Sequence, residues 1–245
     1  MKLTVLGSSG AYPSQTNGTT SFLLQSEDFS LLIDAGSGSF VQLEKKLDPL
    51  KLDAVLLSHY HGDHIADLQV LQYYRQLNRG AETPILPIYG NDEDECHFKL
   101  LTIPEVSQGY AYQEGENITI GPFSISFMKT IHPVPCFAFR IEEVKTGKIF
   151  VFTGDSGYME RWPEFAKDAD LFLADTFFYT GNEKNAFHFT AKETGEIAKA
   201  AKVKHVVATH LKEGMEEKRL VTEIENASDF QMVVDVAHPN DSYEI

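Results

Sequence analysis

The chain has 245 residues, a hydrophobic fraction of 42% and a formal net charge of −15. This length fits one large domain, and no Pro-, Gly- or Ser-rich linker divides the sequence, so we expect a single domain over residues 1–245. The acidic balance disfavours broad electrostatic capture of a long nucleic acid. A small anionic substrate, attracted by a local positive charge such as a bound cation, is favoured instead.

The sequence also bears on the compartment. Residues 1–7 lead directly into a strand-like run and lack the apolar stretch and cleavage site of a signal peptide. No uninterrupted apolar segment is long enough to span a bilayer. Only two cysteines are present, Cys96 and Cys136, which argues against a disulfide framework. We therefore expect a cytoplasmic protein.

Short apolar runs separated by turn-forming clusters predict a series of strands in the first quarter of the chain. They cover residues 3–6, 20–25 and 31–33, and a compact buried strand covers residues 53–57. Apolar residues then recur at every third position over residues 65–77. This spacing predicts a helix with one buried face.

The second half begins with three predicted strands and then changes character. Further strands are expected at residues 119–128, 136–141, 149–152, 171–174 and 205–208. The segment from Thr190 to Glu193 fits a capping box at the start of a helix. Strands first follow one another and then alternate with helices, which favours an α/β fold with two packed sheets and helices outside.

The strongest chemical signal is the segment His59-Tyr60-His61-Gly62-Asp63-His64. Three imidazoles and one carboxylate fall within six consecutive positions, and these are donor types that Zn²⁺ prefers. In an extended backbone His59 and His61 point the same way, while Gly62 allows a sharp turn toward a second metal. Two neighbouring metal ions are therefore plausible.

This segment resembles the His-x-His-x-Asp-His signature of the metallo-β-lactamase superfamily, and it matches at all four ligand positions. The likeness extends along essentially the whole chain. Asp34, within Leu32-Ile33-Asp34-Ala35-Gly36, looks like the first family motif, whose aspartate hydrogen-bonds around the metal loop. The later motifs are matched in order by His132, Asp155 and His210. The resemblance implies an α/β fold of the four-layer αββα metallo-β-lactamase type.

The resemblance also implies how two divalent metal ions are held. One ion is bound by His59, His61 and His132, the other by Asp63, His64 and His210, and Asp155 bridges them. We expect Zn²⁺, with Mn²⁺ or Fe²⁺ left open. A hydroxide bridging the two metals would act as the nucleophile, and Asp63 would orient it. The oxygen-reducing di-iron relatives place a glutamate where His61 stands, which argues against redox chemistry.

Within the superfamily the sequence is similar to ribonuclease Z and related phosphodiesterases, through residues 6–10, 132–135 and His188-Phe189-Thr190. In ribonuclease Z the last motif is typically His-Ser-Thr, and its histidine is thought to assist cleavage, which implies an acid or phosphate-contact role for His188. A helix start at Thr190 would favour an anion nearby.

Two features depart from ribonuclease Z. The interval between His132 and Asp155 lacks the long insertion that forms its tRNA-clamping arm. Ala174 stands near the position of the glutamate that partners its catalytic histidine, with Asp175 beside it, and the sequence leaves open whether Asp175 substitutes.

We therefore expect a metal-dependent hydrolase, a phosphodiesterase acting on small or cyclic nucleotides or similar compact phosphodiesters. A ribonuclease Z-like RNA endonuclease, a thioester or lactone hydrolase, and a metal-binding module without catalysis stay open as alternatives, because the fold and its ligands are shared by many activities. No membrane partner is expected, and a homodimer is suggested by the family alone.

Overall fold

The computed structural model describes residues 1–245 and contains two compact units. Residues 1–113 with 238–244 form the first unit, and residues 114–237 with residue 245 form the second. Each unit contains one mixed β-sheet. Two compact units can still be halves of one cooperative domain, so the single domain over residues 1–245 stays a prediction. None of the helices has the length and apolar character needed to cross a membrane.

The first unit is built on an eight-stranded sheet. Its strands are β1 (Lys2–Ser9), β2 (Gly18–Thr19), β3 (Ser21–Ser26), β4 (Phe29–Ile33), β5 (Ala54–Leu56), β6 (Leu86–Asn91), β7 (Ser107–Tyr112) and β15 (Ser242–Glu244). The order is β15-β1-β3-β4-β5-β6-β7, with β2 paired to β1. β1, β3 and β4 are antiparallel neighbours, whereas β4 to β7 run parallel. The strands predicted at residues 3–6, 20–25, 31–33 and 53–57 are confirmed, while β6 and β7 were not predicted.

Short helical segments connect these strands. They are α1 (Ser39–Glu44), η1 (Pro49–Lys51), α2 (Gly62–Ile65), α3 (Leu68–Asn78), α4 (Glu95–Phe98) and η2 (Lys99–Leu101). Leu68 and Leu71 of α3 join a core that also contains Val55 and Ile88 of the sheet. Burial of these apolar side chains supplies the main free energy that holds α3 on the sheet.

The helix predicted over residues 65–77 corresponds to α3, which begins only at Leu68 because Ile65 belongs to α2, and its buried face differs from the prediction. α3 buries Leu71 together with Arg75, whereas Leu77 is 78% exposed. A spacing of three residues falls short of the helical repeat of about 3.6, so side chains at that spacing rotate steadily around the helix. Arg75 is accepted in the interior because its guanidinium donates to the carbonyls of Pro49 and Pro84 at 2.8 and 2.7 Å.

The second unit is built on a seven-stranded sheet. Its strands are β8 (Asn117–Ile120), β9 (Phe123–Lys129), β10 (Phe137–Glu143), β11 (Lys148–Phe152), β12 (Leu171–Asp175), β13 (His205–Thr209) and β14 (Val233–Val236). β8 to β11 form an antiparallel meander, and β11 to β14 are parallel. The single strand predicted over residues 119–128 is wrong, because Gly121, with φ of 55°, makes a turn between β8 and β9.

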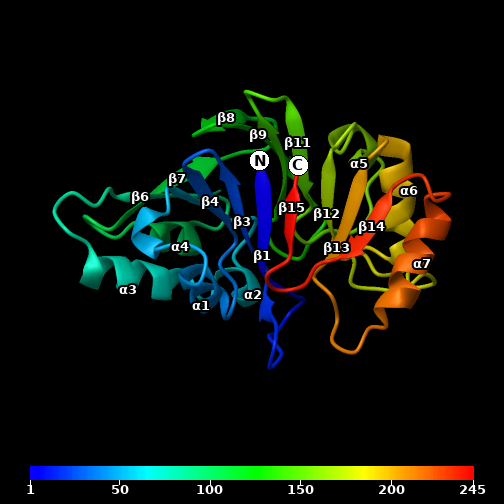
Figure 1. Cartoon of the computed structure of the whole chain (residues 1–245), viewed down its shortest axis with the longest axis horizontal. Helices are drawn as coiled ribbons and strands as arrows, with labels where there is room; N and C mark the ends of the chain where they lie inside the picture. Colours follow the sequence, from blue (N-terminus) through cyan, green and yellow to red (C-terminus); the bar gives the residue numbers. More distant parts are fainter. The chain divides into compact units, whose positions relative to one another are not determined.

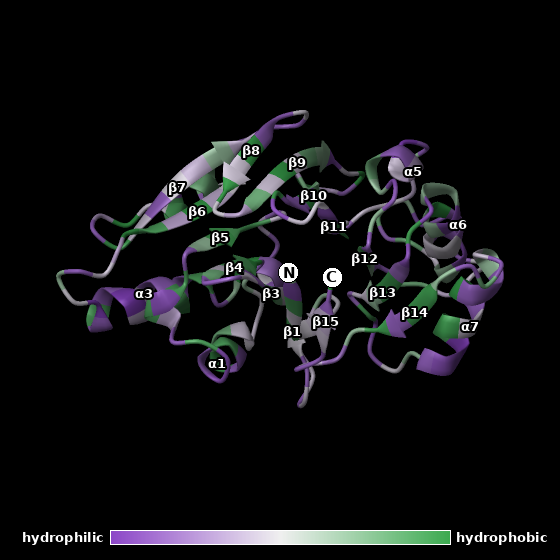
Figure 2. Ribbon diagram, turned by 45° about the horizontal axis from the view of Figure 1, so that its top comes forward, coloured by the Kyte–Doolittle hydropathy of each residue, from purple (hydrophilic) through white to green (hydrophobic).

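Three helices accompany this sheet: α5 (Trp162–Phe165), α6 (Ala191–Ala201) and α7 (Glu217–Ala227). Figure 1 shows α6 and α7 side by side near β13 and β14, and Ile197 and Leu220 pack with Phe172 and Val206 of the sheet. In Figure 2 the strands β13 and β14 are mostly hydrophobic and α7 mostly hydrophilic, as expected for a helix that covers a sheet with one face. The predicted capping box at Thr190 is confirmed.

Asp170 links three segments of the second unit and makes its stability depend on pH. Its carboxylate accepts hydrogen bonds from Lys148 Nζ at 2.9 Å, Lys204 Nζ at 2.8 Å and the Ile149 amide at 2.9 Å. Burial raises the pKa of Asp170, but these three donors outweigh burial and lower the pKa below its ordinary value. A lowered folded pKa stabilises the fold above the unfolded pKa, and this contribution is lost as the pH falls through the folded value.

We expect Asp170→Asn to lower the free energy of unfolding by about 1–3 kcal/mol at pH 7, since hydrogen bonds to a buried carboxylate are lost. The difference from the wild type should shrink once the pH falls below the unfolded pKa of about 3.9, where Asp170 of the unfolded chain becomes protonated, and should vanish below the lower folded pKa. Urea unfolding at pH 7 and at pH 3 measures both values. A difference of equal size at the two pH values would contradict this role.

Candidate metal centre

The histidine-rich loop lies just beyond the end of β5, as predicted. It leads from β5 into α2, so that Asp63 and His64 occupy the first turn of that short helix. His59 and His64 are fully buried, while His61 and Asp63 are half-buried. Imidazoles enter a protein interior when their nitrogens are satisfied by hydrogen bonds or by a metal.

Asp34 fixes this loop from the end of β4, and its predicted hydrogen bonding around the loop is confirmed. Its Oδ1 accepts from the Ser58 amide at 2.7 Å, and its Oδ2 accepts from Ser58 Oγ at 2.7 Å. The same Oδ2 lies 2.7 Å from His64 Nδ1. Because a carboxylate accepts, Nδ1 of His64 carries the proton and Nε2 keeps its electron pair for a metal. Burial raises the pKa of Asp34, and the nearby His64 and the hydrogen bonds from Ser58 oppose that rise.

The backbone around Asp34 also touches the loop directly. Asp34 has a positive φ of 54°, which turns the chain sharply after β4. The Ala35 amide donates to the His64 carbonyl at 2.7 Å. A Cβ on Gly36 would lie 2.2 Å from the Asp63 carbonyl oxygen, so only glycine permits this approach. Residues 32–36 thus pack against the histidine-rich loop and hold its backbone in position.

Two pairs of donor atoms in the loop are close to each other. Nε2 of His59 lies 3.1 Å from Nδ1 of His61, and Nε2 of His64 lies 3.6 Å from Oδ2 of Asp63. The His59 and His64 rings, with centroids 4.0 Å apart, join these two pairs, so the first unit groups all four of its predicted ligands. Asp63 Oδ2 additionally accepts from the Ala11 amide at 3.0 Å, which holds this carboxylate in position.

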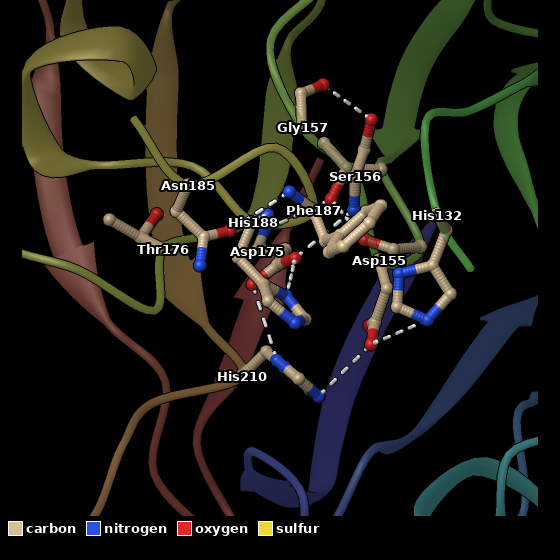
Figure 3. A network of polar contacts seen from close by, with 12 residues as sticks. His132, Asp155, Ser156, Gly157, Asp175, Thr176, Asn185, Phe187, His188 and His210 are labelled. Carbon is tan, nitrogen blue, oxygen red and sulfur yellow. Dashed lines mark hydrogen bonds and ion pairs between the residues drawn. The ribbon is translucent and has the colours of Figure 1, made fainter. Parts of the chain in front are cut away.

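The second unit brings its three predicted ligands together at the ends of strands (Figure 3). Asp155 follows β11, and its Oδ2 lies 3.8 Å from His132 Nε2 and 3.4 Å from His210 Nε2. Thr130 Oγ1 donates to the Asp155 carbonyl at 2.8 Å, which ties the segment before His132 to Asp155. His210 follows β13 with a positive φ of 57°. One carboxylate oxygen of Asp155 thus lies near both imidazoles.

Asp175, at the end of β12, contacts two histidines at once. Its Oδ2 lies 2.7 Å from His188 Nδ1 and accepts from the Ser156 amide at 3.1 Å. Its Oδ1 lies 3.2 Å from His210 Nδ1. Asp175 therefore orients both rings so that each Nε2 points away from it, as Figure 3 shows. The question that the sequence leaves open is answered: Asp175 is the carboxylate partner of His188.

His188 lies beside the other imidazoles of this unit. Its ring stacks on that of His210 with centroids 5.2 Å apart and packs against Phe177 at 5.0 Å. Burial lowers the pKa of His188, but the charge and hydrogen bond of Asp175 outweigh burial and raise the pKa above its ordinary value. Because the Asp175 carboxylate accepts, Nδ1 of His188 carries a proton.

The start of α6 does not offer the anion site that we expected near His188. The Thr190 amide and hydroxyl both donate to the Glu193 carboxylate, at 2.8 and 2.9 Å. The capping carboxylate already occupies the helix start. A contact between His188 and a phosphate would therefore have to come from the imidazole ring itself and not from the helix terminus.

The donor set fits a divalent metal ion. In a tetrahedral zinc site with bonds of 2.0–2.1 Å, neighbouring ligand atoms lie about 3.3–3.4 Å apart. The distances between donor atoms in the four pairs described above are 3.1, 3.6, 3.8 and 3.4 Å, which are close to this expected spacing. Imidazole nitrogens and carboxylate oxygens are also the ligands of Mn²⁺ and Fe²⁺. Side chains supplied within each unit are thus arranged for metal binding.

Sequence reasoning missed one supporting residue. Ser58 donates from its amide and hydroxyl to Asp34, and its Oγ lies 3.1 Å from His59 Nδ1. The sequence does contain a signal for this role, because the Ser58 hydroxyl directly precedes the first predicted ligand, His59. Ser58 thereby links Asp34 to His59, a ligand that Asp34 does not reach itself.

Known proteins resemble this chain over most of its length. The family model described as "Beta-lactamase superfamily domain" matches residues 30–211. The probable metallo-hydrolase YhfI of Bacillus subtilis is 44% identical over 216 residues, which cover 86% of this chain and 87% of the relative. Ribonuclease Z of Bacillus velezensis is 23% identical and covers 86% and 88% of the two chains.

Solved structures are similar as well. The crystal structure of the metallo-β-lactamase fold protein YhfI from Bacillus subtilis matches with a TM-score of 0.94 and 38% identity, covering 100% of this chain and 99% of the other. Human tRNase Z, short form, matches with a TM-score of 0.78 and 23% identity over 100% and 99% of the chains. A diphosphatase from the PhnP family gives a TM-score of 0.77 at 19% identity, covering 100% and 97%.

Proposed function

Because this chain belongs to the β-lactamase superfamily and has its α/β fold, as the sequence predicts, we propose that it is a phosphodiesterase acting on small or cyclic nucleotides or similar compact phosphodiesters. The superfamily and the grouped histidines and aspartates imply a metal-dependent hydrolase. The proposal adds a substrate class, phosphodiesters, to this general activity. The observation that carries it is the His188–Asp175 pair, placed beside His210 and Asp155.

We propose that the protein binds two divalent metal ions, with Zn²⁺ as the preferred metal. Their ligands would be His59, His61, Asp63, His64, His132, Asp155 and His210. Such ions, when bound, acidify water and neutralise charge on an attacked phosphoryl group. Two observations support this assignment. The ligands follow one another along the chain in the order typical of the superfamily, and donor atoms within each unit lie close together.

The protein's own residues supply the remaining steps. His188, held by Asp175 through Nδ1, can deliver a proton from Nε2 to the leaving oxygen as the ester bond breaks. Asp63 is proposed to orient the attacking water in addition to binding metal. Asp34 and Asp175 do not touch the substrate; they hold the rings of His64, His188 and His210 in one orientation.

Two observations support a phosphorus ester over the rival hydrolases. Relatives of similar fold include enzymes named for phosphoryl chemistry, namely ribonuclease Z, tRNase Z and a diphosphatase. A proton donor beside the predicted metal ligands suits an alkoxide leaving group, which needs protonation more than a thiolate does. A compact substrate is favoured because only β10, β11 and short connections separate His132 from Asp155.

A substrate panel tests this proposal. Protein of measured metal content, prepared with Zn²⁺ and separately with Mn²⁺, is assayed on a chromogenic phosphodiester, a thioester, a lactone and a β-lactam. We expect turnover of the phosphodiester to exceed that of the others and to disappear when a chelator removes the metal. Activity on the thioester or lactone alone would replace the proposed substrate class by one of those.

The remaining expectations stay proposals. We propose a cytoplasmic protein, in line with the presence of only two cysteines in the sequence, and a homodimer on the basis of the family. A small anionic phosphodiester is the proposed partner, in preference to long nucleic acid. Analytical ultracentrifugation measures the oligomeric state directly.

A further inference from the structure

We propose that Ile131, Tyr158 and Phe187 form a binding surface for the planar base of the substrate, here called the apolar rim, with Phe187 as its main contact. This inference rests on the proposed phosphodiesterase function and adds the residues that select a nucleoside-bearing substrate. All three residues belong to the second unit.

The apolar rim consists of large hydrophobic side chains that solvent reaches. Ile131 is 43% exposed, Tyr158 is 44% exposed and Phe187 is 40% exposed. Each one is near the predicted chemistry in sequence: Ile131 precedes His132, Phe187 precedes His188, and Tyr158 follows Asp155 by three positions. Grouped exposed apolar side chains next to a polar site are typical of ligand recognition.

Gly157 brings the three segments into contact. Its amide donates to the Ile131 carbonyl at 3.0 Å. A Cβ on Gly157 would lie only 1.8 Å from the Ala186 carbonyl oxygen, so the segment that carries Phe187 packs directly on the Gly157 backbone. The residue that follows Gly157 is Tyr158. These backbone contacts bring the segments that carry Ile131, Tyr158 and Phe187 side by side.

Phe187 is also placed directly beside the histidines. Its ring meets that of His132 at 84° with centroids 6.3 Å apart, an edge-to-face arrangement. Figure 3 shows the Phe187 ring next to His132 and Asp155. His132 lies in turn 5.6 Å from the ring of His188. A phosphodiester held at these imidazoles would therefore have its attached group within reach of Phe187.

The chemistry of the rim favours a nucleobase as that group. Two of the three side chains are aromatic, and bases of every kind stack on aromatic faces. The three side chains carry no charge, whereas the protein as a whole has a net charge of −15, so the rim offers a neutral surface beside a site for an anion. A substrate with a charged phosphodiester and a neutral planar base is complementary to both parts.

The experiment compares two esters that share one leaving group: thymidine 5′-(4-nitrophenyl phosphate) and methyl 4-nitrophenyl phosphate. We expect the wild type to prefer the nucleoside ester through a lower KM. Phe187→Ala should reduce the ratio of the two kcat/KM values about 5- to 150-fold, the range for loss of one stacked base. Tyr158→Ala should reduce the ratio in the same direction, and Phe187→Tyr, which keeps an aromatic face, should restore it.

Phe230→Ala is the matched control, because Phe230 is an aromatic residue of the same unit that is 66% exposed and lies beyond the end of α7. Phe230→Ala should leave kcat/KM for both esters unchanged. Equal kcat/KM values for the two esters in the wild type, or an unchanged ratio in both Phe187→Ala and Tyr158→Ala, would overturn the role of the rim. A variant that loses self-association while keeping the ratio would assign the rim to a second copy of the chain instead. Failure to cleave either ester would reject the phosphodiesterase function itself.

Discussion

Replacing His188 by alanine should lower turnover of phosphodiesters with poor leaving groups by about 10²- to 10⁴-fold, the usual contribution of a positioned general acid. The imidazole is held by Asp175 at 2.7 Å through Nδ1, so its Nε2 is the nitrogen that can protonate a leaving oxygen. Metal content should stay at the wild-type level, because His188 is not among the predicted ligands. Steady-state kinetics and elemental analysis of the purified variant measure the two effects.

The leaving group distinguishes an acid from a structural residue. A 4-nitrophenolate departs without protonation, so the defect of His188→Ala should be much smaller on a 4-nitrophenyl ester than on an alkyl ester. His205→Ala is the matched control, since His205 is also an imidazole of the second unit bound to a carboxylate, Asp235 at 2.8 Å. An equal loss on both esters would rule out His188 as the acid.

Asp34→Asn should weaken metal binding about 10- to 100-fold, the usual effect of removing a carboxylate that orients a ligating histidine. Oδ2 of Asp34 accepts from Ser58 Oγ and from His64 Nδ1. The amide of asparagine keeps only one accepting oxygen, so in either orientation its donating nitrogen would face the Ser58 amide or the Nδ1–H of His64 in the interior. His64 would then lose the partner that directs its Nε2. Competition with a chelator of known affinity measures the apparent metal dissociation constant.

Asp53→Asn provides the comparison for this effect. Asp53 is a carboxylate of the same unit that accepts a backbone hydrogen bond, from the Ser30 amide at 2.8 Å, but it is exposed and does not contact the loop. It should leave metal affinity unchanged. If Asp34→Asn binds metal as tightly as Asp53→Asn does, Asp34 supports the fold of the first unit and not the ligands.

Asp175 gives this protein a different arrangement from the one that ribonuclease Z implies. In ribonuclease Z a glutamate near the position of Ala174 partners the catalytic histidine. In this protein Asp175, the residue after Ala174, contacts His188. Asp175 also contacts His210 at 3.2 Å. One carboxylate therefore orients a proposed proton donor and a proposed metal ligand. A change at Asp175 would disturb both, so it is a poor variant for separating acid catalysis from metal binding.

The sequence by itself determined the features that depend on local order. The histidine-rich loop after β5, the strands with strong apolar runs and the capping box at Thr190 were all predicted, because each depends on residues close together in the chain. The superfamily followed from the motif spacing. Strands β6 and β7 were missed because their burial comes from neighbours in the sheet and their own pattern is weak.

Only the tertiary structure decided which partners the supporting carboxylates contact, although the family motif already indicated Asp34. Asp175 and His188 meet across 13 positions of sequence, and Asp34 and His64 across 30, so no local pattern links them. The same holds for Gly157, whose tight approach to Ala186 places Phe187. Hydrogen-bond partners and close backbone contacts between distant segments depend on how strands are ordered in a sheet, and this order is set by packing of the whole unit.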